Sequence, residues 1–137
     1  MLTLKSNYLE TLPNFLMYFG TAVALTALFL FLYTLITPHR EWQLIRAGNN
    51  AAAISLSGAS IGFAIPFASV IIQSQNLLDM AIWAIVVLVV QLGAYLVARV
   101  LKPGLSRKIE ARDTAHGTVL AAISVTAGIL NAACMTY

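Results

Sequence analysis

Four long apolar runs, separated by short polar segments, organise this chain. They cover residues 13–37, 49–73, 78–101 and 114–136. A helix needs about 20 predominantly apolar residues to cross the hydrocarbon core of a bilayer, and each run is long enough. Arg99 lies near the end of the third run, where its long stem can carry the charge to the headgroups. The runs are expected to be helical, because a helix pairs its backbone N–H and C=O groups internally.

The composition indicates that lipid surrounds most of the chain. The sequence has 137 residues, of which 60% are apolar and 9% are charged. About a quarter of the residues of a soluble domain are charged, so this chain has too few charges for a water-facing surface. The first run exceeds the roughly 7–15 residues of a signal-peptide core and is interpreted as a retained span. The sequence therefore predicts an all-α polytopic membrane protein, with residues 1–137 in one integral membrane domain of four transmembrane helices.

The basic residues are distributed unevenly between the two sides of this domain. Seven of the eight Lys and Arg residues lie after the first run or at and after the end of the third: Arg40, Arg46, Arg99, Lys102, Arg107, Lys108 and Arg112. Lys5 is alone on the opposite side. Segments rich in Lys and Arg stay in the cytoplasm, so we expect both basic segments to be cytoplasmic and both termini to be periplasmic. The net charge of +3 then reflects topology, and nucleic-acid binding is not expected.

The first basic segment, residues 38–48, has the pattern of a short interfacial helix. Trp42 and Ile45 are three residues apart, which predicts one apolar face with Trp42 at headgroup depth. The charged side chains expected to face water are those of Arg40, Glu41 and Arg46. Asn49 follows at the position where a side-chain oxygen would cap the start of the second span.

The second half of the chain repeats features of the first at a shift of 69 residues. The shift places Glu41 on Glu110, Gly48 on Gly117, and Ala52-Ala53-Ile54-Ser55 on Ala121-Ala122-Ile123-Ser124. Two spans return the chain to the side where it began, so a duplicated hairpin (2+2) would relate its halves by an axis along the membrane normal. The alternative is that small residues recur by chance in alanine-rich helices.

Small and weakly polar residues form a stripe along the second run and another along the fourth. The second run carries Ala51, Ser55, Gly58, Gly62, Pro66, Ser69 and Gln73. The fourth run carries Gly117, Ala121, Ser124, Gly128 and Asn131. Spacings of three and four keep each set near one helix face. Gly58 and Gly62 form a GxxxG motif, which lets two helix backbones approach closely. We therefore expect the second and fourth spans at the centre and the bulkier first and third spans outside.

Pro66 predicts an irregular backbone in the second span. Proline has no N–H, so the carbonyl of Gly62 loses its usual helical donor. One hypothesis is that this carbonyl, with Ser55, Ser69 and Asn131 nearby, holds water or a cation. The alternative is a kinked helix in which a neighbouring Ser or Asn satisfies the carbonyl.

The sequence lacks the residue patterns typical of catalysis or metal binding. No Asp, Glu, Lys or His lies deep in a span, which argues against a proton relay through carboxylates. His39 and His116 lie at predicted membrane boundaries near Glu41, Glu110 and Asp113, but no metal-binding spacing such as HExxH is present. No nucleophile elbow, Walker loop or GxGxxG occurs. We expect no catalytic residue, no metal and no cofactor, and therefore no enzyme.

Several stretches of the chain resemble a known family. They include TPHRE and LIRAGN within residues 33–49, IGFAIP at residues 61–66, GILNAACMT at residues 128–136, and also Gly58, Trp83 and Gln91. On these residues the chain resembles the YjfL family of bacterial inner-membrane proteins, a domain of unknown function. The resemblance implies a four-span inner-membrane protein with no catalytic residues to carry over. It also implies a role in membrane maintenance, because relatives accompany membrane-stress proteins of the phage-shock type.

Two hypotheses of function follow. The first is a self-associating, non-enzymatic membrane component that forms homo-oligomers through the second and fourth spans, such as a channel or transport subunit. The second is an adaptor whose basic cytoplasmic segments recruit anionic lipid or a peripheral partner, such as a membrane-stress protein. The loop residues that would serve the adaptor are Glu41, Trp42, Arg46, Asn49, Arg107, Lys108 and Arg112. In both hypotheses the lipid bilayer is the first partner.

Overall fold

A computed structural model describes residues 2–37 and 40–135 of the chain, with side chains for residues 11–37 and 40–135. Within these residues it contains helices and no strand, which confirms the predicted all-α class. The helices are α1 (Leu2–Ile36), α2 (Glu41–Arg46), α3 (Asn50–Gln73), α4 (Leu77–Leu101), α5 (Leu105–Glu110) and α6 (Thr114–Cys134).

Four of these helices contain segments that are long and apolar enough to cross a membrane. The segments are Thr11–Ile36, Asn50–Gln73, Leu77–Leu101 and Thr114–Cys134. Helix α1 begins earlier than its apolar run, at Leu2, and passes through Pro13. A proline removes one backbone donor but does not end this helix, so the helix and the apolar run start at different residues.

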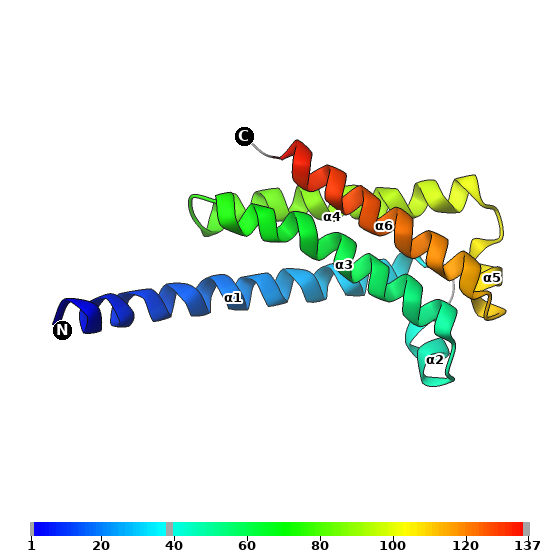
Figure 1. Ribbon diagram of the computed structural model, residues 1–137, viewed down its shortest axis with the longest axis horizontal. Coiled ribbons are helices and arrows are strands. Elements are labelled where there is room, and N and C mark those ends of the chain that lie inside the picture. Colours follow the sequence, from blue (N-terminus) through cyan, green and yellow to red (C-terminus); the bar gives the residue numbers. More distant parts are fainter. Residues whose placement is uncertain (1, 38–39, 136–137) are drawn as a thin grey trace.

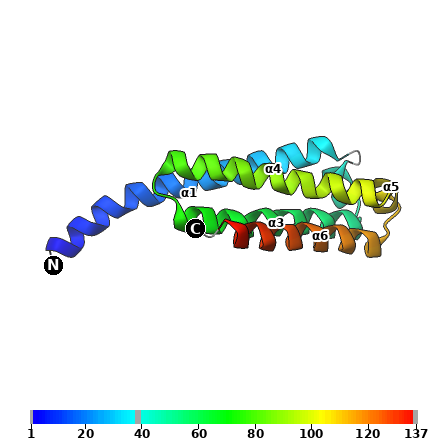
Figure 2. The same ribbon diagram turned by 90° about the horizontal axis from the view of Figure 1, so that it is seen from above.

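The four long helices form two layers, α1 with α4 and α3 with α6 (Figure 2). The short helices α2 and α5 lie together at one end of the bundle, and both chain termini lie toward the other end (Figure 1). Short connections make this layout: residues 47–49 join α2 to α3, and residues 111–113 join α5 to α6.

Aromatic side chains fill the space between the layers. Phe29 of α1 stacks on Phe63 of α3, with ring centroids 4.5 Å apart and an interplanar angle of 10°. Tyr33 of α1 meets Tyr95 of α4 edge to face at 5.3 Å. All four side chains are buried. The outer faces of α1 and α4 instead expose large apolar side chains suited to lipid contact, among them Phe31, Leu35, Ile85 and Val89.

Helices α3 and α6 run side by side with almost no side-chain volume between their backbones. A Cβ added at Gly58 would overlap Ala121, and one added at Gly128 would overlap the carbonyl of Gly62. A Cβ at Gly117 would lie 2.6 Å from the carbonyl oxygen of Ala51. Lipid offers no hydrophobic drive for helix association, so close backbone packing of this kind supplies the contact energy.

The turns that lead into α3 and α6 repeat each other at a shift of 64 residues. Gly48 and Arg112 both have left-handed backbones, with φ values of 83° and 64°. The next residue, Asn49 or Asp113, caps the following helix by accepting a hydrogen bond on its side chain. The backbone hydrogen bonds of the two turns also correspond pair by pair. The chain is therefore a duplicated hairpin with equivalent turns.

The shift of 69 residues expected from sequence was the wrong register. Under the 64-residue shift Ala121 is equivalent to Ser57, which is next to Gly58, its packing partner. Equivalent residues then lie at the same height, as an axis along the membrane normal requires. Under the 69-residue shift Ala121 would match Ala52, which lies about 9 Å along α3 from Gly58, the residue that Ala121 contacts. The sequence AAIS occurs at residues 52–55 and again at 121–124, but these two runs are not at equivalent positions in the repeat. The turns before α3 and α6 define the equivalence.

Candidate functional site

The end of the bundle that carries α2 and α5 is built by hydrogen bonds between the two hairpins. Asn49 is 2% exposed, and its Oδ1 accepts from the backbone N–H of Ala52 at 3.1 Å, which caps α3. Its Nδ2 donates to the carbonyl of Ile109 at 2.8 Å, at the end of α5. The last carbonyls of a helix lack donors within that helix, so Asn49 satisfies one orphan group in each hairpin.

Arg112 makes the reciprocal connection from the second hairpin to the first. Its guanidinium donates to the carbonyl of Ala47 at 2.9 Å and to the carbonyl of Gly48 at 3.4 Å, just beyond the end of α2. Each turn therefore donates to backbone carbonyls near the end of the other hairpin's short helix. We call α2, α5 and the two turns, residues 41–49 and 105–113, the cap.

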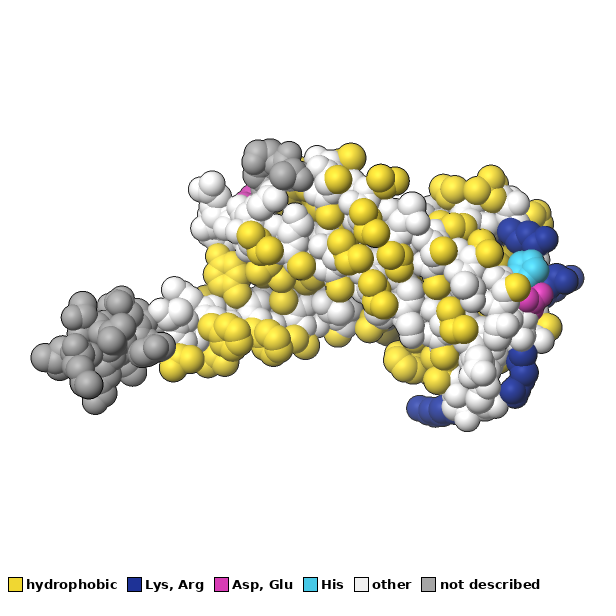
Figure 3. All heavy atoms as spheres, viewed as in Figure 1, with side chains coloured by type: hydrophobic (Ala, Val, Ile, Leu, Met, Phe, Trp, Pro, Cys, Tyr) yellow, Lys and Arg dark blue, Asp and Glu magenta, His cyan; other side chains and the backbone are white. Residues whose placement is uncertain are grey.

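The cap and the residues next to it gather most of the positive charge of the protein. The exposed cationic side chains at this end are those of Arg40, Arg46, Arg99, Lys102, Arg107, Lys108 and Arg112. Figure 3 shows Lys and Arg side chains on the visible face at the end formed by α2 and α5, next to apolar flanks. Glu110 is exposed and Asp113 half-buried, so the surface of the cap is strongly basic.

The prediction that Glu41 faces water was wrong. Glu41 is 1% exposed, whereas Trp42 is 54% exposed and Arg46 is also exposed. The carboxyl lies close enough to the hydroxyls of Tyr33 and Tyr95 to interact with them electrostatically. Glu41 is the first residue of α2 and turns toward the bundle, a direction that spacing along a single helix did not reveal.

Asp113 and His116 form a local pair at the start of α6. The backbone N–H of His116 donates to Asp113 Oδ1 at 3.3 Å, and His116 Nδ1 lies 2.8 Å from Asp113 Oδ2. The hydrogen bond from the His116 backbone, and then the imidazole, lower the pKa of the Asp113 carboxyl below its ordinary value. In the described part of the chain no three His, Cys, Asp or Glu residues cluster as metal ligands would. His39 lies outside the described residues.

The small-residue stripes predicted from sequence face each other across the α3–α6 contact. Buried positions on this face include Ser55, Gly58, Gly62, Pro66, Gly117, Ser124 and Gly128. Ser69 and Asn131 are half-buried. Ser55 donates to the carbonyl of Ala52 on its own helix at 3.0 Å.

The freed carbonyl of Gly62 points at α6, because a Cβ at Gly128 would overlap it. A Cβ at Gly62 would in turn overlap the carbonyl of Ser124. The backbone of α6 therefore covers this carbonyl within the same chain.

Gln91 is the polar residue of the interior that sequence reasoning missed. It is 2% exposed, and neither polar atom of its amide has a hydrogen-bond partner among the described residues. Its Oε1 lies 3.1 Å from the position that a Cβ at Gly62 would take, beside the α3–α6 contact. The hydroxyls of Tyr33 and Tyr95 are likewise buried without such a partner.

Gln91 lies on α4 one turn before Tyr95, whose ring meets Tyr33 of α1. On α1, Phe29 lies one turn before Tyr33 and stacks on Phe63, so rings fill the interior beside α1. Beside α4 the interior instead holds the amide of Gln91. A lone glutamine in the middle of an apolar run is the sequence signal that could have pointed to it.

Four apolar helices and a basic cap define a small multi-pass membrane protein. The chain belongs to the family described as Domain of Unknown Function (DUF350), whose model matches residues 7–135. It is similar to the UPF0719 inner membrane protein YjfL of Escherichia coli K12, with 41% identity over 129 residues, 94% of this chain and 98% of that protein. These findings confirm the family resemblance that the sequence motifs indicated.

A second relative comes from Bacillus subtilis. The chain is 33% identical to the UPF0719 transmembrane protein YshE of Bacillus subtilis 168 over 110 residues, 79% of this chain and 82% of that protein. No solved structure matches the chain.

The connection between the hairpins is tested by comparing two capping asparagines. Asn76 caps α4 by accepting from the backbone N–H of Asp79 at 2.8 Å, and its side chain makes no bond to the first hairpin within the described residues. We expect Asn76→Ala to lower the free energy of unfolding by about 1 kcal/mol. Asn49→Ala should lower the free energy of unfolding by about 1–2 kcal/mol more, because it also leaves the buried carbonyl of Ile109 without this donor. The measurement is reversible unfolding in detergent followed by circular dichroism. Equal losses would contradict the connection.

The buried amide is tested by replacing it with an apolar group of similar size. Gln91→Leu should raise the free energy of unfolding by about 1–2 kcal/mol, because it removes a polar group that has no partner. Gln73→Leu is the control, since Gln73 donates to Ser69 at 3.4 Å and should gain nothing. Both are measured in the same unfolding assay. Destabilisation by Gln91→Leu would contradict the assignment of Gln91 as a buried amide without a partner.

Proposed function

We propose that the protein is a non-enzymatic adaptor of the inner membrane, whose cap faces the cytoplasm and recruits a peripheral protein with an acidic surface. The observation that carries this proposal is the reciprocal connection between the hairpins, Asn49 to Ile109 and Arg112 to Ala47. It holds cationic side chains from two loops distant in sequence in one array. A loop that served only to orient the chain in the membrane would need no such connection.

The orientation rests on the charge asymmetry of the fold. The exposed basic side chains lie at the end that carries the cap, and both termini lie toward the opposite end (Figure 1). Basic segments next to transmembrane helices stay in the cytoplasm, so the termini are periplasmic in this proposal. The relative from Escherichia coli is named an inner membrane protein, which supports the same membrane for this chain.

A fixed basic surface suits a partner of opposite charge. Preorganised side chains lose less conformational freedom on binding than side chains of a mobile loop. Their combined field also steers an acidic protein toward the membrane and weakens as salt increases. A peripheral membrane-stress protein, the partner class that the family resemblance implies, fits this role.

The adaptor is tested by photo-crosslinking from two exposed glutamines at opposite ends. Gln43 lies on α2 and Gln75 lies in the α3–α4 loop. A photoreactive residue at 43 should give adducts with a cytoplasmic protein, while one at 75 should give none. Arg107→Glu with Lys108→Glu should remove the adduct from position 43, read by mass spectrometry. An adduct that survives charge reversal contradicts recruitment by charge, and cytoplasmic adducts from position 75 overturn the orientation.

Self-association is the second candidate, favoured by a groove on the outer side of the α3–α6 layer. The small-residue stripes of α3 and α6 pack against each other within one chain. A second copy would therefore have to bind at another surface. The groove holds about 540 Å³, and its walls include Ala53, Ser57, Gly58, Ala121 and Ala122. Small residues at a lipid-facing surface allow another helix to pack closely. A homodimer through this groove would place α3 and α6 at the centre of the assembly.

Disulfide trapping in native membranes tests the dimer. In a Cys134→Ser background, Ser57→Cys should form a crosslinked dimer after mild oxidation, because Ser57 lines the groove. Val89→Cys is the control, since Val89 is 61% exposed on α4, away from the groove. Crosslinking by both variants alike, or by Val89→Cys alone, would refute this interface.

A further inference from the structure

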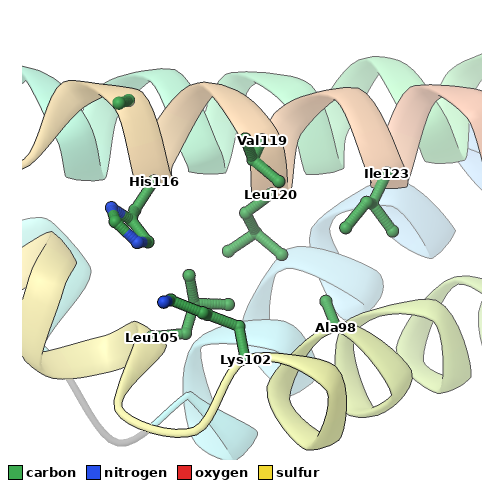
Figure 4. A pocket seen from close by; sticks show the side chains of 8 residues that line it. Ala98, Lys102, Leu105, His116, Val119, Leu120 and Ile123 are labelled. Carbon is green, nitrogen blue, oxygen red and sulfur yellow. The ribbon is translucent and has the colours of Figure 1, made fainter.

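A pocket at the cap end has one cationic end and one apolar end. It holds about 240 Å³ and lies between the end of α4, the start of α5 and the first turns of α6. Figure 4 shows Lys102 and His116 at one end of the pocket, and Ile123 and Ala98 toward the other. Leu105 and Leu120 contribute further apolar walls.

The depth of the pocket matches the boundary between headgroups and hydrocarbon. Lys102 follows directly after α4 ends at Leu101, and His116 lies in the first turn of α6. Ala98 and Ile123 lie within the two spans. A molecule in this pocket would therefore have its polar part at the level of the headgroups and its apolar part among hydrocarbon chains.

The two nitrogen-bearing side chains at the pocket, Lys102 and His116, are not equivalent. The imidazole of His116 is paired with Asp113, whose lowered pKa keeps the carboxylate charged. Lys102 is exposed and makes no ion pair within residues 40–135. The unneutralised charge at the mouth of the pocket is therefore the ammonium of Lys102.

An apolar groove continues from the pocket along the bundle. It holds about 460 Å³ between α4 and α6, and it shares Val119 and Ile123 with the pocket. Its other walls include Ala94, Val97 and Ala127. Pocket and groove together form a track that runs from Lys102 into the hydrocarbon layer. A free phosphate would use only the mouth of this track, whereas an amphiphile with a charged head and an apolar chain would use both of its parts.

We propose that this track is a binding site for an anionic phospholipid. The phosphate of the lipid pairs with Lys102, and one acyl chain lies in the groove between α4 and α6. Basic pockets between transmembrane helices recognise anionic headgroups in this way. The lipid site shares the orientation of the adaptor proposal but uses residues outside the peripheral protein's surface. A bound lipid would also fill the space between α4 and α6 beside the cap.

Native mass spectrometry of the full chain tests the site with two defined lipids, phosphatidylglycerol and phosphatidylcholine. The wild-type protein should retain phosphatidylglycerol about fivefold more than phosphatidylcholine. Lys102→Gln should remove this preference, while Lys108→Gln, on the exposed face of α5, should leave it unchanged. Val119→Trp should block the groove and reduce binding of both lipids. Ile129→Trp is its matched control, at an exposed position on α6 outside the track.

Each alternative occupant gives a different result. If the two lipids are retained equally, or if Lys102→Gln has no effect on their retention, lipid binding is non-specific and the proposal is overturned. Binding of glycerol phosphate as strong as that of phosphatidylglycerol would assign the site to a free anion. If the wild-type protein is a dimer and Val119→Trp makes it a monomer, the groove binds a second copy of the chain instead of a lipid. If position 43 gives no cytoplasmic adduct even without charge reversal while phosphatidylglycerol is still retained, the adaptor is rejected and the lipid site stands.

Discussion

The close approach of α3 and α6 is the interaction on which the rest of the structure depends. In lipid there is no hydrophobic drive to bring helices together, so contact energy comes from backbones that meet without intervening side chains. Gly58, Gly62, Gly117 and Gly128 remove the volume that would keep the two helices apart. Because each glycine lies against the partner helix, the contact defines the height of one hairpin relative to the other. That height then brings the two turns of the cap within hydrogen-bond reach.

Duplication followed by divergence explains where the polar features lie. The two turns have the same backbone conformation but different side chains. Gly48 and Asn49 of one turn correspond to Arg112 and Asp113 of the other. The differences are complementary, because Asn49 and Arg112 each donate to the opposite hairpin. In the interior, Gln91 of the second hairpin brings a buried amide beside the α3–α6 contact. The places where the halves differ are therefore the places to look for function.

The proposed partner surface on the cap and the proposed lipid site would use charge in two different ways. On the cap, Arg46, Arg107 and Lys108 are exposed and held in one array, which suits an extended acidic surface. At the track a single unpaired ammonium, that of Lys102, stands over an apolar groove, which suits one amphiphilic molecule. A lipid bound there would lie beside α5 and could stabilise the cap in its position. Both uses depend on the same end of the bundle facing anionic headgroups.

The sequence by itself determined the four spans, the helical class and the separation of charge between the two ends, because each depends on residues near one another in the chain. It also predicted that the side chain of Asn49 caps the start of α3. The two small-residue stripes were predicted from helical periodicity. The tertiary structure decided the register of the repeat, the burial of Glu41, the position of Gln91, and the pocket and groove between α4 and α6. These features arise from contacts between residues far apart in sequence, and such contacts leave no periodic signal in the chain.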